Sequence, residues 1–339
     1  MHIFHNTNYN FLRWRWHAVA LSWVVIIAGL LVIYAKGIPL GLEFAGGTSV
    51  IAQFDKTPSV DDVRTALNRN FQGGGENAIV QSYGDPALRQ VMVRVPTVGA
   101  EQGTSLSVQA QAVEAALRKD GSLGNFRVVG TEIVGPAVGE ELTQKGLWAF
   151  FLSLAGILAY IAFRFELSFA VGAVIATIHD VLVTLAFLAF FQYDITLNVI
   201  AAILTVTGYS TNDTIVIFDR VRENMRSHRR DKLFDVVNVA LNQTLGRTVI
   251  TAGTAFLSAI ALFLFGGEVL HGFAFTMIVG IITGTYSSVF VAAAIVTFWR
   301  TKKGRPAMAG AAPTPAVSAA PGGTPQTSRR AKQRKARAS

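Results

Sequence analysis

Long apolar stretches separated by polar segments dominate the pattern of hydrophobic and polar positions along this chain. A helix needs about 20 mostly apolar residues to span the hydrocarbon core of a bilayer. Six stretches come close to or exceed this length: 18–36, 146–163, 167–191, 196–218, 248–265 and 272–299. The pattern therefore predicts a membrane α-helical bundle of six transmembrane helices, with a single first helix and a five-helix region over 146–300.

The polar block between the first two predicted spans, residues 37–145, has the pattern of a separate α+β domain. Strand-like runs cover 48–54, 78–83, 90–95 and 126–134, and amphipathic helical runs cover 59–71 and 105–119. Ser59 and Asp62 form a capping box at the start of the first helix, and Gly73–Gly75 breaks the chain after it. The order β-α-β-β-α-β predicts a ferredoxin-like domain. Because its sequence holds no catalytic triad, phosphate loop or metal-ligand cluster, we expect a recognition or mechanical role.

The distribution of Lys and Arg predicts the orientation of the spans. Basic residues lie before the first span, after the second, within the loop 219–247 and after the last span, whereas the turns 192–195 and 266–271 hold none. The N-terminus (1–17) and the tail (301–339) are therefore predicted to be cytoplasmic, and the domain 37–145 to be exported. The first span is longer than a usual signal-peptide core, which favours an uncleaved anchor.

Two cytoplasmic segments have a composition of their own. Residues 231–246, within the loop 219–247, repeat apolar positions at helical spacing and are expected to lie on the membrane surface. The tail is rich in Ala, Pro, Gly, Ser and Thr and ends in a basic cluster at 329–337, so disorder is expected. The basic cluster is either a solvated positive end or a weak contact for anionic lipids or the ribosome.

Composition narrows the class of protein further. The chain has 339 residues, of which 51% are hydrophobic and 15% charged, and it has no Cys. Disulfides and Cys-based metal or redox chemistry are therefore excluded. The sequence also lacks the GxxxxGK[ST] pattern of a phosphate-binding loop. We expect a membrane protein that is not an enzyme and carries no cofactor or metal.

Charged side chains inside the predicted spans are the candidate functional residues, because a charge in the hydrocarbon costs about 2.5–3.5 kcal/mol on insertion scales. Asp213 lies beside Asn212, about five residues from the cytoplasmic end of the fourth span, and Arg247 enters the fifth span from the same side. An Arg side chain is long enough to reach Asp213 from there. His179 and Asp180 lie deeper, in the third span, but about 100° apart around the helix, so no pair between them is expected.

Three interpretations of Asp213 and Arg247 follow from spacing alone. A buried carboxylate whose protonation responds to nearby charge can carry protons and couple a proton gradient to movement of the bundle. A static Asp–Arg clamp between the fourth and fifth spans would use the same residues, as would solvation near the membrane interface. For His179 an interhelix hydrogen bond is the simpler interpretation, and for Asp180 a structural role and a coupling role stay open.

Five short segments, in order and at matching topological places, resemble the SecF family of the bacterial SecDF protein-export complex. They are 41–48 (GLEFAGGT), 132–142 (EIVGPAVGEEL), 178–182 (IHDVL), 208–224 and 284–288 (GTYSS). Glu43 stands where this family commonly has Asp, which is a conservative change. The resemblance covers residues 10–300 and implies a fold of the resistance-nodulation-division-like (RND) membrane superfamily.

The resemblance also implies partners and roles for individual residues. SecF-like proteins pair with SecD and work with the SecYEG channel, often with YajC, in the bacterial cytoplasmic (inner) membrane. The pair is thought to use the proton motive force to promote late translocation and release of the preprotein. Asp213 and Arg247 would be proton-pathway residues, with His179, Asp180 and Asn212 as second candidates. Glu43, Gly46 and Gly47 would belong to a loop that couples the spans to the exported domain.

Two alternatives belong to other classes. One is a half-size RND-type proton-coupled exporter of lipids or small hydrophobic molecules, although such exporters usually have larger exported domains. The other is a passive assembly factor in which the charges are clamps. Loss of proton-driven preprotein release on replacing Asp213 with Asn would separate the translocase subunit from the assembly factor. A defect confined to one small hydrophobic compound would favour the exporter.

Overall fold

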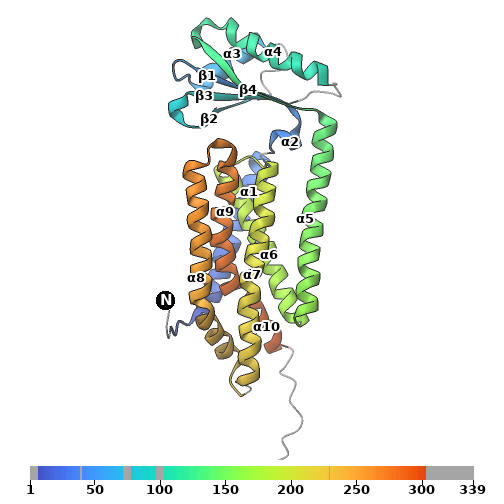
Figure 1. Ribbon diagram of the computed structural model, residues 1–339, viewed down its shortest axis with the longest axis vertical. Coiled ribbons are helices and arrows are strands. Elements are labelled where there is room, and N and C mark those ends of the chain that lie inside the picture. The colour runs from blue at the N-terminus through green and yellow to red at the C-terminus, as the bar shows by residue number, and fades with distance from the viewer. Residues whose placement is uncertain (1–6, 39, 72–77, 97–102, 229, 303–339) are drawn as a thin grey trace, which may run out of the picture. The chain divides into compact units, whose positions relative to one another are not determined.

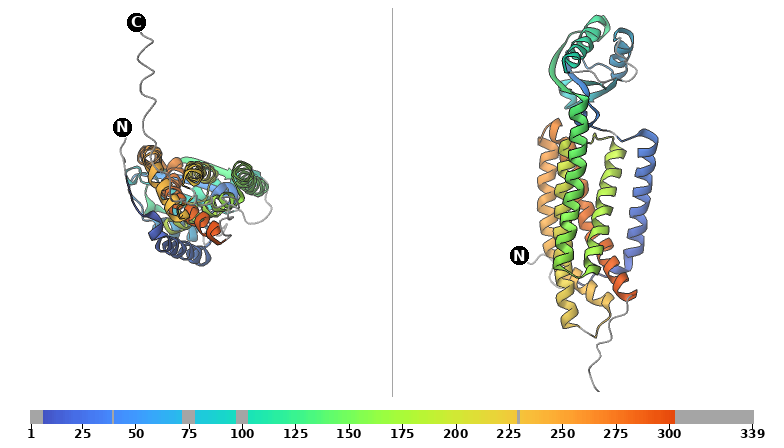
Figure 2. Two further views of the ribbon diagram at one scale, coloured as in Figure 1. Left: turned by 90° about the horizontal axis from the view of Figure 1, so that it is seen from below. Right: turned by 90° about the vertical axis from the view of Figure 1, so that its right-hand side faces the viewer.

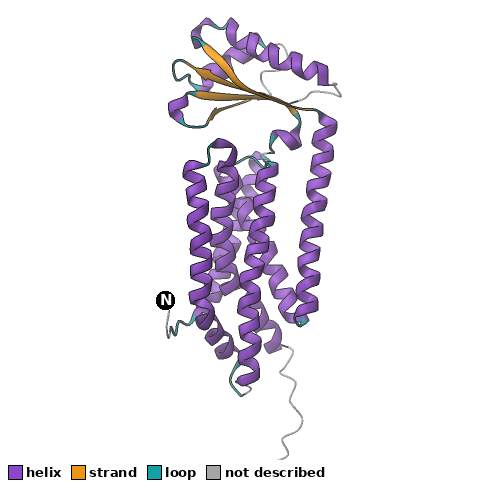
Figure 3. Cartoon of the chain, in the orientation of Figure 1, coloured by secondary structure: helices purple, strands orange, loops and turns teal. Residues whose placement is uncertain are grey.

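The computed structural model of the chain describes residues 7–38, 40–71, 78–96, 103–228 and 230–302. The predicted break at Gly73–Gly75 and nearly all of the predicted tail lie outside these residues. Helices dominate the described part, and the strands are confined to the polar block between the first two spans (Figure 3).

Long helices that contact one another form a bundle (Figures 1 and 2). They are α1 (Arg15–Lys36, after the short helix η1, Phe11–Trp14), α5 (Pro136–Arg164), α6 (Leu167–Phe191), α7 (Leu197–Ser227), α8 (Leu233–Phe265) and α9 (Glu268–Ser287). After α9 come the π-helical turn η5 (Ser288–Ala292) and α10 (Ala293–Lys302). Within the described residues, five helical segments are long and apolar enough to cross a membrane. The remaining long helix, α7, has enough polar residues to fall outside that set.

Two helix boundaries differ from the predicted ones. The helix α5 begins at Pro136, ten residues before the predicted span, because Pro suits the first helical position and the polar residues that follow continue the helix. The sequence pattern separates a surface helix that ends at 246 from a fifth span that begins at 248, and this prediction of a break at Gly246 is wrong: α8 runs from Leu233 to Phe265 and joins the two. A single Gly costs a helix only about 1 kcal/mol, which the packing of α8 outweighs. The bounds of α6 agree with the prediction.

The polar block contains a four-stranded antiparallel sheet in the order β2-β3-β1-β4. Along the chain its elements are β1 (Gly47–Phe54), α3 (Val60–Asn70), β2 (Ile79–Tyr83), η3 (Pro86–Leu88), β3 (Gln90–Val95), α4 (Gly103–Lys119), η4 (Gly121–Leu123) and β4 (Phe126–Val134). Both long helices lie on one face of the sheet (Figure 1), and their apolar side chains share a core with Phe54 and Val93. Ser59 caps α3 as predicted, with its hydroxyl accepting from the Asp61 amide.

Close helix packing in the bundle depends on small residues. Gly280 of α9 faces the Val206 side chain of α7, and a Cβ at Gly284 would come within 2.8 Å of the Ser210 Cβ. A Cβ at Gly172 of α6 would lie 2.9 Å from the Val296 side chain of α10. The small residues at 172, 280 and 284 thus let the helix backbones approach closely.

An N-terminal strap, residues 7–14, crosses the N-terminal half of α8. Asn238 and Asn242 bond the backbone of Tyr9 and Phe11: each amide nitrogen donates to the Tyr9 carbonyl at 2.8–2.9 Å, and each amide oxygen accepts a backbone N–H. Leu12 is fully buried in the same core as Val237 of α8. The expected position of 231–246 on the membrane surface stays a prediction. Its i, i+4 asparagines bind another segment of this chain.

Candidate functional site

Asp213 lies on the face of α7 that contacts α8, and its side chain is buried, with 8% of the residue exposed. Its Oδ1 accepts a hydrogen bond of 2.8 Å from the Thr248 hydroxyl of α8. Its Oδ2 is also buried and has no hydrogen-bond partner among the described residues. A carboxylate normally accepts several hydrogen bonds, so the free oxygen leaves this group able to bind a proton.

Arg247 precedes Thr248 on α8 but is exposed on the outside of the helix. Within the described residues no ion pair joins Arg247 to Asp213. The predicted proximity of the two helices is confirmed, but the two charged groups are not in contact. The neighbouring Thr248 hydroxyl makes the direct contact.

Asn212 is exposed and lies away from the Asp213 contact, on the side of α7 that faces α5. There it lines an open groove of about 420 Å³. The residues that line the groove are Gly156, Ile157, Tyr160, Gly208, Thr211, Asn212 and Ile215. The Thr211 hydroxyl is buried without a partner in the described structure. Asn212 and Asp213 therefore belong to different surfaces of one helix.

His179 and Asp180 form a pair, contrary to the prediction. His179 Nδ1 lies 3.0 Å from Asp180 Oδ1, and Asp180 is 1% exposed. Adjacent residues leave a helix about 100° apart, but the imidazole is long enough to turn back onto a neighbouring carboxylate that is closed off from solvent. His179 Nε2 is buried and has no partner among the described residues.

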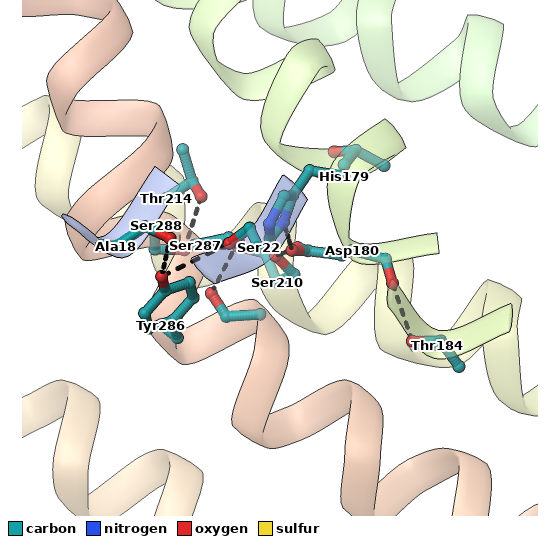
Figure 4. A network of polar contacts seen from close by, with 12 residues as sticks. Ala18, Ser22, His179, Asp180, Thr184, Ser210, Thr214, Tyr286, Ser287 and Ser288 are labelled. Carbon is teal, nitrogen blue, oxygen red and sulfur yellow. Dashed lines mark hydrogen bonds and ion pairs between the residues drawn. The ribbon is translucent and has the colours of Figure 1, made fainter. Parts of the chain in front are cut away.

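Hydroxyl groups extend this pair across the bundle (Figure 4). Ser210 of α7 donates to Asp180 Oδ2 at 2.6 Å, and Ser288 of η5 donates to the Ser210 carbonyl at 3.4 Å. Thr214 and Ser288 share a hydrogen bond of 2.7 Å. We call His179, Asp180, Ser210, Thr214 and Ser288 the inner network. The hydroxyl members were not predicted as site residues, although the motifs 208–224 and 284–288 contain all three of them.

Tyr286 of α9 links the inner network to α1. Its ring stacks on the ring of His179, with 6.4 Å between the centroids. Its hydroxyl donates to the Ala18 carbonyl at 2.5 Å and accepts from Ser22 at 3.3 Å (Figure 4). The network thus involves α1, α6, α7, α9 and η5.

The predicted coupling loop forms a short helix, α2 (Leu42–Ala45), followed by two glycines with positive φ. Gly46 has φ of 67° and Gly47 of 128°, values that favour glycine because they crowd a Cβ. Glu43 lies within α2 and is half-buried. Gly139 of α5 approaches the carbonyls of Glu43 and Phe44, so that α2 packs against the start of α5.

A junction of polar contacts joins the sheet to the turn between α6 and α7. Arg94 of β3 pairs with Asp194 in that turn at 2.8 Å and donates to the Leu40 carbonyl at 3.3 Å. The Gly41 amide donates to the Ile195 carbonyl at 2.8 Å. The turn between the two helices that carry Asp180 and Asp213 is therefore bound directly to the domain.

Replacing both Arg94 with Met and Asp194 with Asn is expected to show coupling of about 0.5–3 kcal/mol in a double-mutant cycle, because the pair is mostly buried. The measurement is the free energy of unfolding of the purified protein. Arg127→Met serves as the matched control, since Arg127 is an exposed sheet arginine bonded to Gln53. Additive effects of the two junction substitutions would contradict the prediction.

Metal binding finds no support in this site. Among the described residues, no group of three or more His, Asp or Glu side chains is arranged to hold a metal ion.

These observations define a class of protein: a helical membrane protein with charged and hydroxyl groups inside its bundle and a small antiparallel sheet bound to one of its turns. Family comparison adds the identity of the class. The family described as "Protein export membrane protein SecD/SecF, C-terminal" matches residues 112–302, and the "SecD/SecF GG Motif" matches residues 32–58, which include Gly46 and Gly47.

Relatives cover most of the chain. The protein translocase subunit SecF of Koribacter versatilis is 36% identical over 92% of this chain and 98% of its own length. The SecF subunits of Escherichia coli O157:H7 and Vibrio alginolyticus are 39% and 42% identical over 85% and 84% of this chain, and 86% and 88% of their own lengths. This chain belongs to the SecF family of protein translocase subunits, which are transport proteins and not enzymes.

Solved structures agree with this assignment. The crystal structure of SecDF, a translocon-associated membrane protein from Thermus thermophilus, matches with a TM-score of 0.77 and 32% identity over 87% of this chain. SecDF in a super-membrane-facing form matches with a TM-score of 0.63 over 88% of this chain. The chain spans 39% and 40% of the lengths of these SecDF chains.

Proposed function

We propose that this subunit uses the proton motive force, together with a SecD partner, to promote late translocation and release of preproteins across the bacterial inner membrane. The observation that carries the proposal is the buried Asp213 carboxylate, with one oxygen bonded to Thr248 of α8 and the other without a partner. Such a group can bind a proton at the contact between two helices. Its charge then determines how strongly the helices attract each other.

The proposed cycle at Asp213 follows from its contacts. The charged carboxylate accepts strongly from the Thr248 hydroxyl and is favoured by the positive charge of Arg247. Protonation removes that attraction and lets α7 and α8 separate or slide. Arg247 and Asp213 thus act as proton-pathway residues, and His179, Asp180 and Asn212 are further candidates.

The proposed membrane arrangement has six spans, both termini in the cytoplasm and a ferredoxin-like periplasmic domain over 37–145. In support, α7 has 31 residues, or a length of about 46 Å at 1.5 Å per residue, and its polar residues Asp213, Ser210 and Thr214 are buried within the protein. The sheet order β2-β3-β1-β4, with α3 and α4 on one face, is the order expected for a ferredoxin-like unit. The tail 301–339 is proposed to stay disordered.

Movement would pass from the spans to the periplasmic domain by two routes. One is the loop with Glu43, Gly46 and Gly47, and the other is the Arg94–Asp194 junction. A SecD partner is proposed because the chain matches about two-fifths of SecDF. Contacts with SecYEG, the preprotein and YajC are proposed from the SecF family, and a weak contact of the tail with anionic lipids or the ribosome from its charge.

The test is reconstitution with SecD, SecYEG and the SecA ATPase in vesicles that carry an imposed proton gradient. We expect preprotein release to increase with the gradient, to fall when an uncoupler collapses it, and to need this subunit. If release ignores the gradient but the complex still assembles, this subunit is an assembly factor. Gradient-driven export of a small hydrophobic compound, with no effect on preprotein, would favour the exporter.

A further inference from the structure

The pair His179–Asp180 is a second buried acid–base group, separate from Asp213. It lies on α6, whereas Asp213 lies on α7 and faces α8. Asp180 is 1% exposed and is bonded at both carboxyl oxygens: Oδ1 lies 3.0 Å from His179 Nδ1, and Oδ2 accepts from Ser210 at 2.6 Å. Both carboxylates are nevertheless linked to α7. Asp213 belongs to that helix, and Asp180 accepts from Ser210, which lies one turn before Asp213.

Hydrogen counting shows that the pair can take up one proton. A single hydrogen must lie between His179 Nδ1 and Asp180 Oδ1. With that hydrogen alone, the pair has a net charge of −1 in a buried place, which is unfavourable. A second proton makes the pair neutral overall, as an imidazolium with a carboxylate or as an imidazole with a carboxylic acid. The proton belongs to the pair and not to one residue.

The surroundings of the pair hold few other charges that could compensate it. Among the described residues, α9 presents Tyr286, which stacks on His179, and α1 presents Ser22. The elements packed against α6 carry further titratable or charged groups in the described structure: Arg15, His17, Tyr34 and Lys36 on α1, Glu140, Glu141, Lys145, Tyr160 and Arg164 on α5, Tyr209, Asp213, Asp219, Arg220, Arg222, Glu223 and Arg226 on α7, His271 on α9, and Arg300 on α10, which is bonded to Glu166 and Ser168. No Lys or Arg of the described structure contacts Asp180.

The π-helical turn η5 begins at the residue that joins the inner network. Ser288 contacts α7 twice, through the Ser210 carbonyl and the Thr214 hydroxyl. π-helical turns are rare and often occur at functional sites, because one extra residue per turn can be lost or moved along the helix. Phe290 of η5 packs on Tyr286, with 5.2 Å between ring centroids. The π-helical turn is thus connected to the inner network in two ways: directly through Ser288, and through Phe290, which packs on the Tyr286 ring that stacks on His179.

We propose that His179 and Asp180 form a second proton-binding site, and that proton uptake there releases Ser210 and allows the π-helical turn at 288–292 to rearrange. A neutral carboxylic acid or an ion-paired carboxylate attracts the Ser210 hydroxyl less than a net negative pair does. The freed hydroxyl can instead bond a carbonyl of its own helix, as Ser commonly does. Such a bond often bends the helix, and because Ser288 donates to the carbonyl of the same Ser210, the change reaches the π-helical turn. The role of this step in transport rests on the proposed function, but proton uptake and rearrangement do not.

The absence of Cys makes a direct test possible, because a single Cys introduced at Phe290 is the only thiol of the chain. The subunit is purified in complex with its partner, with any partner Cys replaced, and the rate of thiol labelling is measured between about pH 8 and about pH 6, where histidines titrate. We expect the rate to change severalfold with pH. Asp180→Asn and His179→Gln should each remove the change, because the altered pair can no longer alternate between a net charge of −1 and a neutral state.

Three further variants separate the steps. Thr184→Val is the matched control, since the Thr184 hydroxyl bonds the backbone carbonyl of Asp180 and not its carboxyl group, and it should keep the pH response. Asp213→Asn should keep it as well. Ser288→Ala should lose the labelling response, because it disconnects the turn from α7. It should keep proton uptake by the pair, measured as an infrared difference band that changes with pH, because the proton site is intact.

A pH response that survives both Asp180→Asn and His179→Gln would overturn the proposal. If either variant fails to fold, Ser288→Ala decides: an unchanged labelling response there excludes control of the turn by the pair. A normal labelling response with preprotein release that ignores the gradient would leave this proton site standing and contradict the proposed function instead.

Discussion

Asp213→Asn is expected to abolish the part of preprotein release that depends on the proton gradient and to leave the subunit folded and bound to its partner. The Asn side-chain oxygen can still accept the Thr248 hydroxyl, so the contact between α7 and α8 is kept. The amide cannot take up a proton, so the proposed alternation of charge is lost. Release with the gradient should fall to the level that wild-type vesicles show with an uncoupler.

Thr205→Val provides the matched control for this substitution. Thr205 lies on the exposed side of the same helix, two turns earlier, and its hydroxyl donates to the Ala201 carbonyl of its own helix. Its removal should leave gradient-driven release unchanged. If Asp213→Asn vesicles keep the full response to the gradient, Asp213 is part of a static contact and the proton pathway lies elsewhere.

Gly280→Ala is expected to destabilise the bundle by about 1–3 kcal/mol, the usual effect of overpacking a close-packed site. A Cβ at Gly280 would lie 2.4–3.0 Å from all three carbons of the Val206 side chain on α7, and Val206 is itself buried. Since neither helix can withdraw without breaking the inner network nearby, the clash must be absorbed by a shift of α9. Thermal unfolding of the purified protein measures the effect, and Gly280→Val should be worse.

Gly253→Ala is the control for packing, because a Cβ at this position of α8 meets nothing within 4 Å. It should be neutral or slightly stabilising, by up to about 1 kcal/mol, since Ala is a better helix former than Gly. Equal effects at the two glycines would show that helix propensity, and not the approach of α7 to α9, determines the result.

Periodic patterns predicted the elements that depend on local sequence. The helix α6 and the strands β3 and β4 have the predicted bounds, because long apolar runs and clear alternation leave little choice of structure. The break at Gly246 was wrong, because the cost of one Gly is smaller than the gain from packing the apolar face of α8. The strap could not be predicted, since Asn238 and Asn242 carry no sign of a partner more than 200 residues away.

The candidate site was predicted in part. Asp213, Asp180 and His179 could be identified from the sequence, because each is a polar group in an apolar run, where its transfer into hydrocarbon is unfavourable. The depth of Asp213 and Arg247 in their spans correctly predicted that α7 and α8 are neighbours. It pointed to Arg247 as the contact of Asp213, whereas Thr248 makes the direct contact. Hydroxyl groups such as Ser210 and Ser288 cost little in a helix and are common there, so their sequence positions alone do not mark them as partners of a charge.

The strap also constrains the order in which the protein can be completed. The backbone of Tyr9 and Phe11 bonds to Asn242 and Asn238, at sequence separations of 233 and 227 residues. At roughly 5–20 residues per second, the ribosome needs on the order of 10–50 s to make the chain between them. During synthesis the strap must therefore keep its backbone groups in water or on another protein until α8 appears. Docking of the strap on α8 is therefore a late step of assembly, because it must wait for a helix made more than 200 residues later.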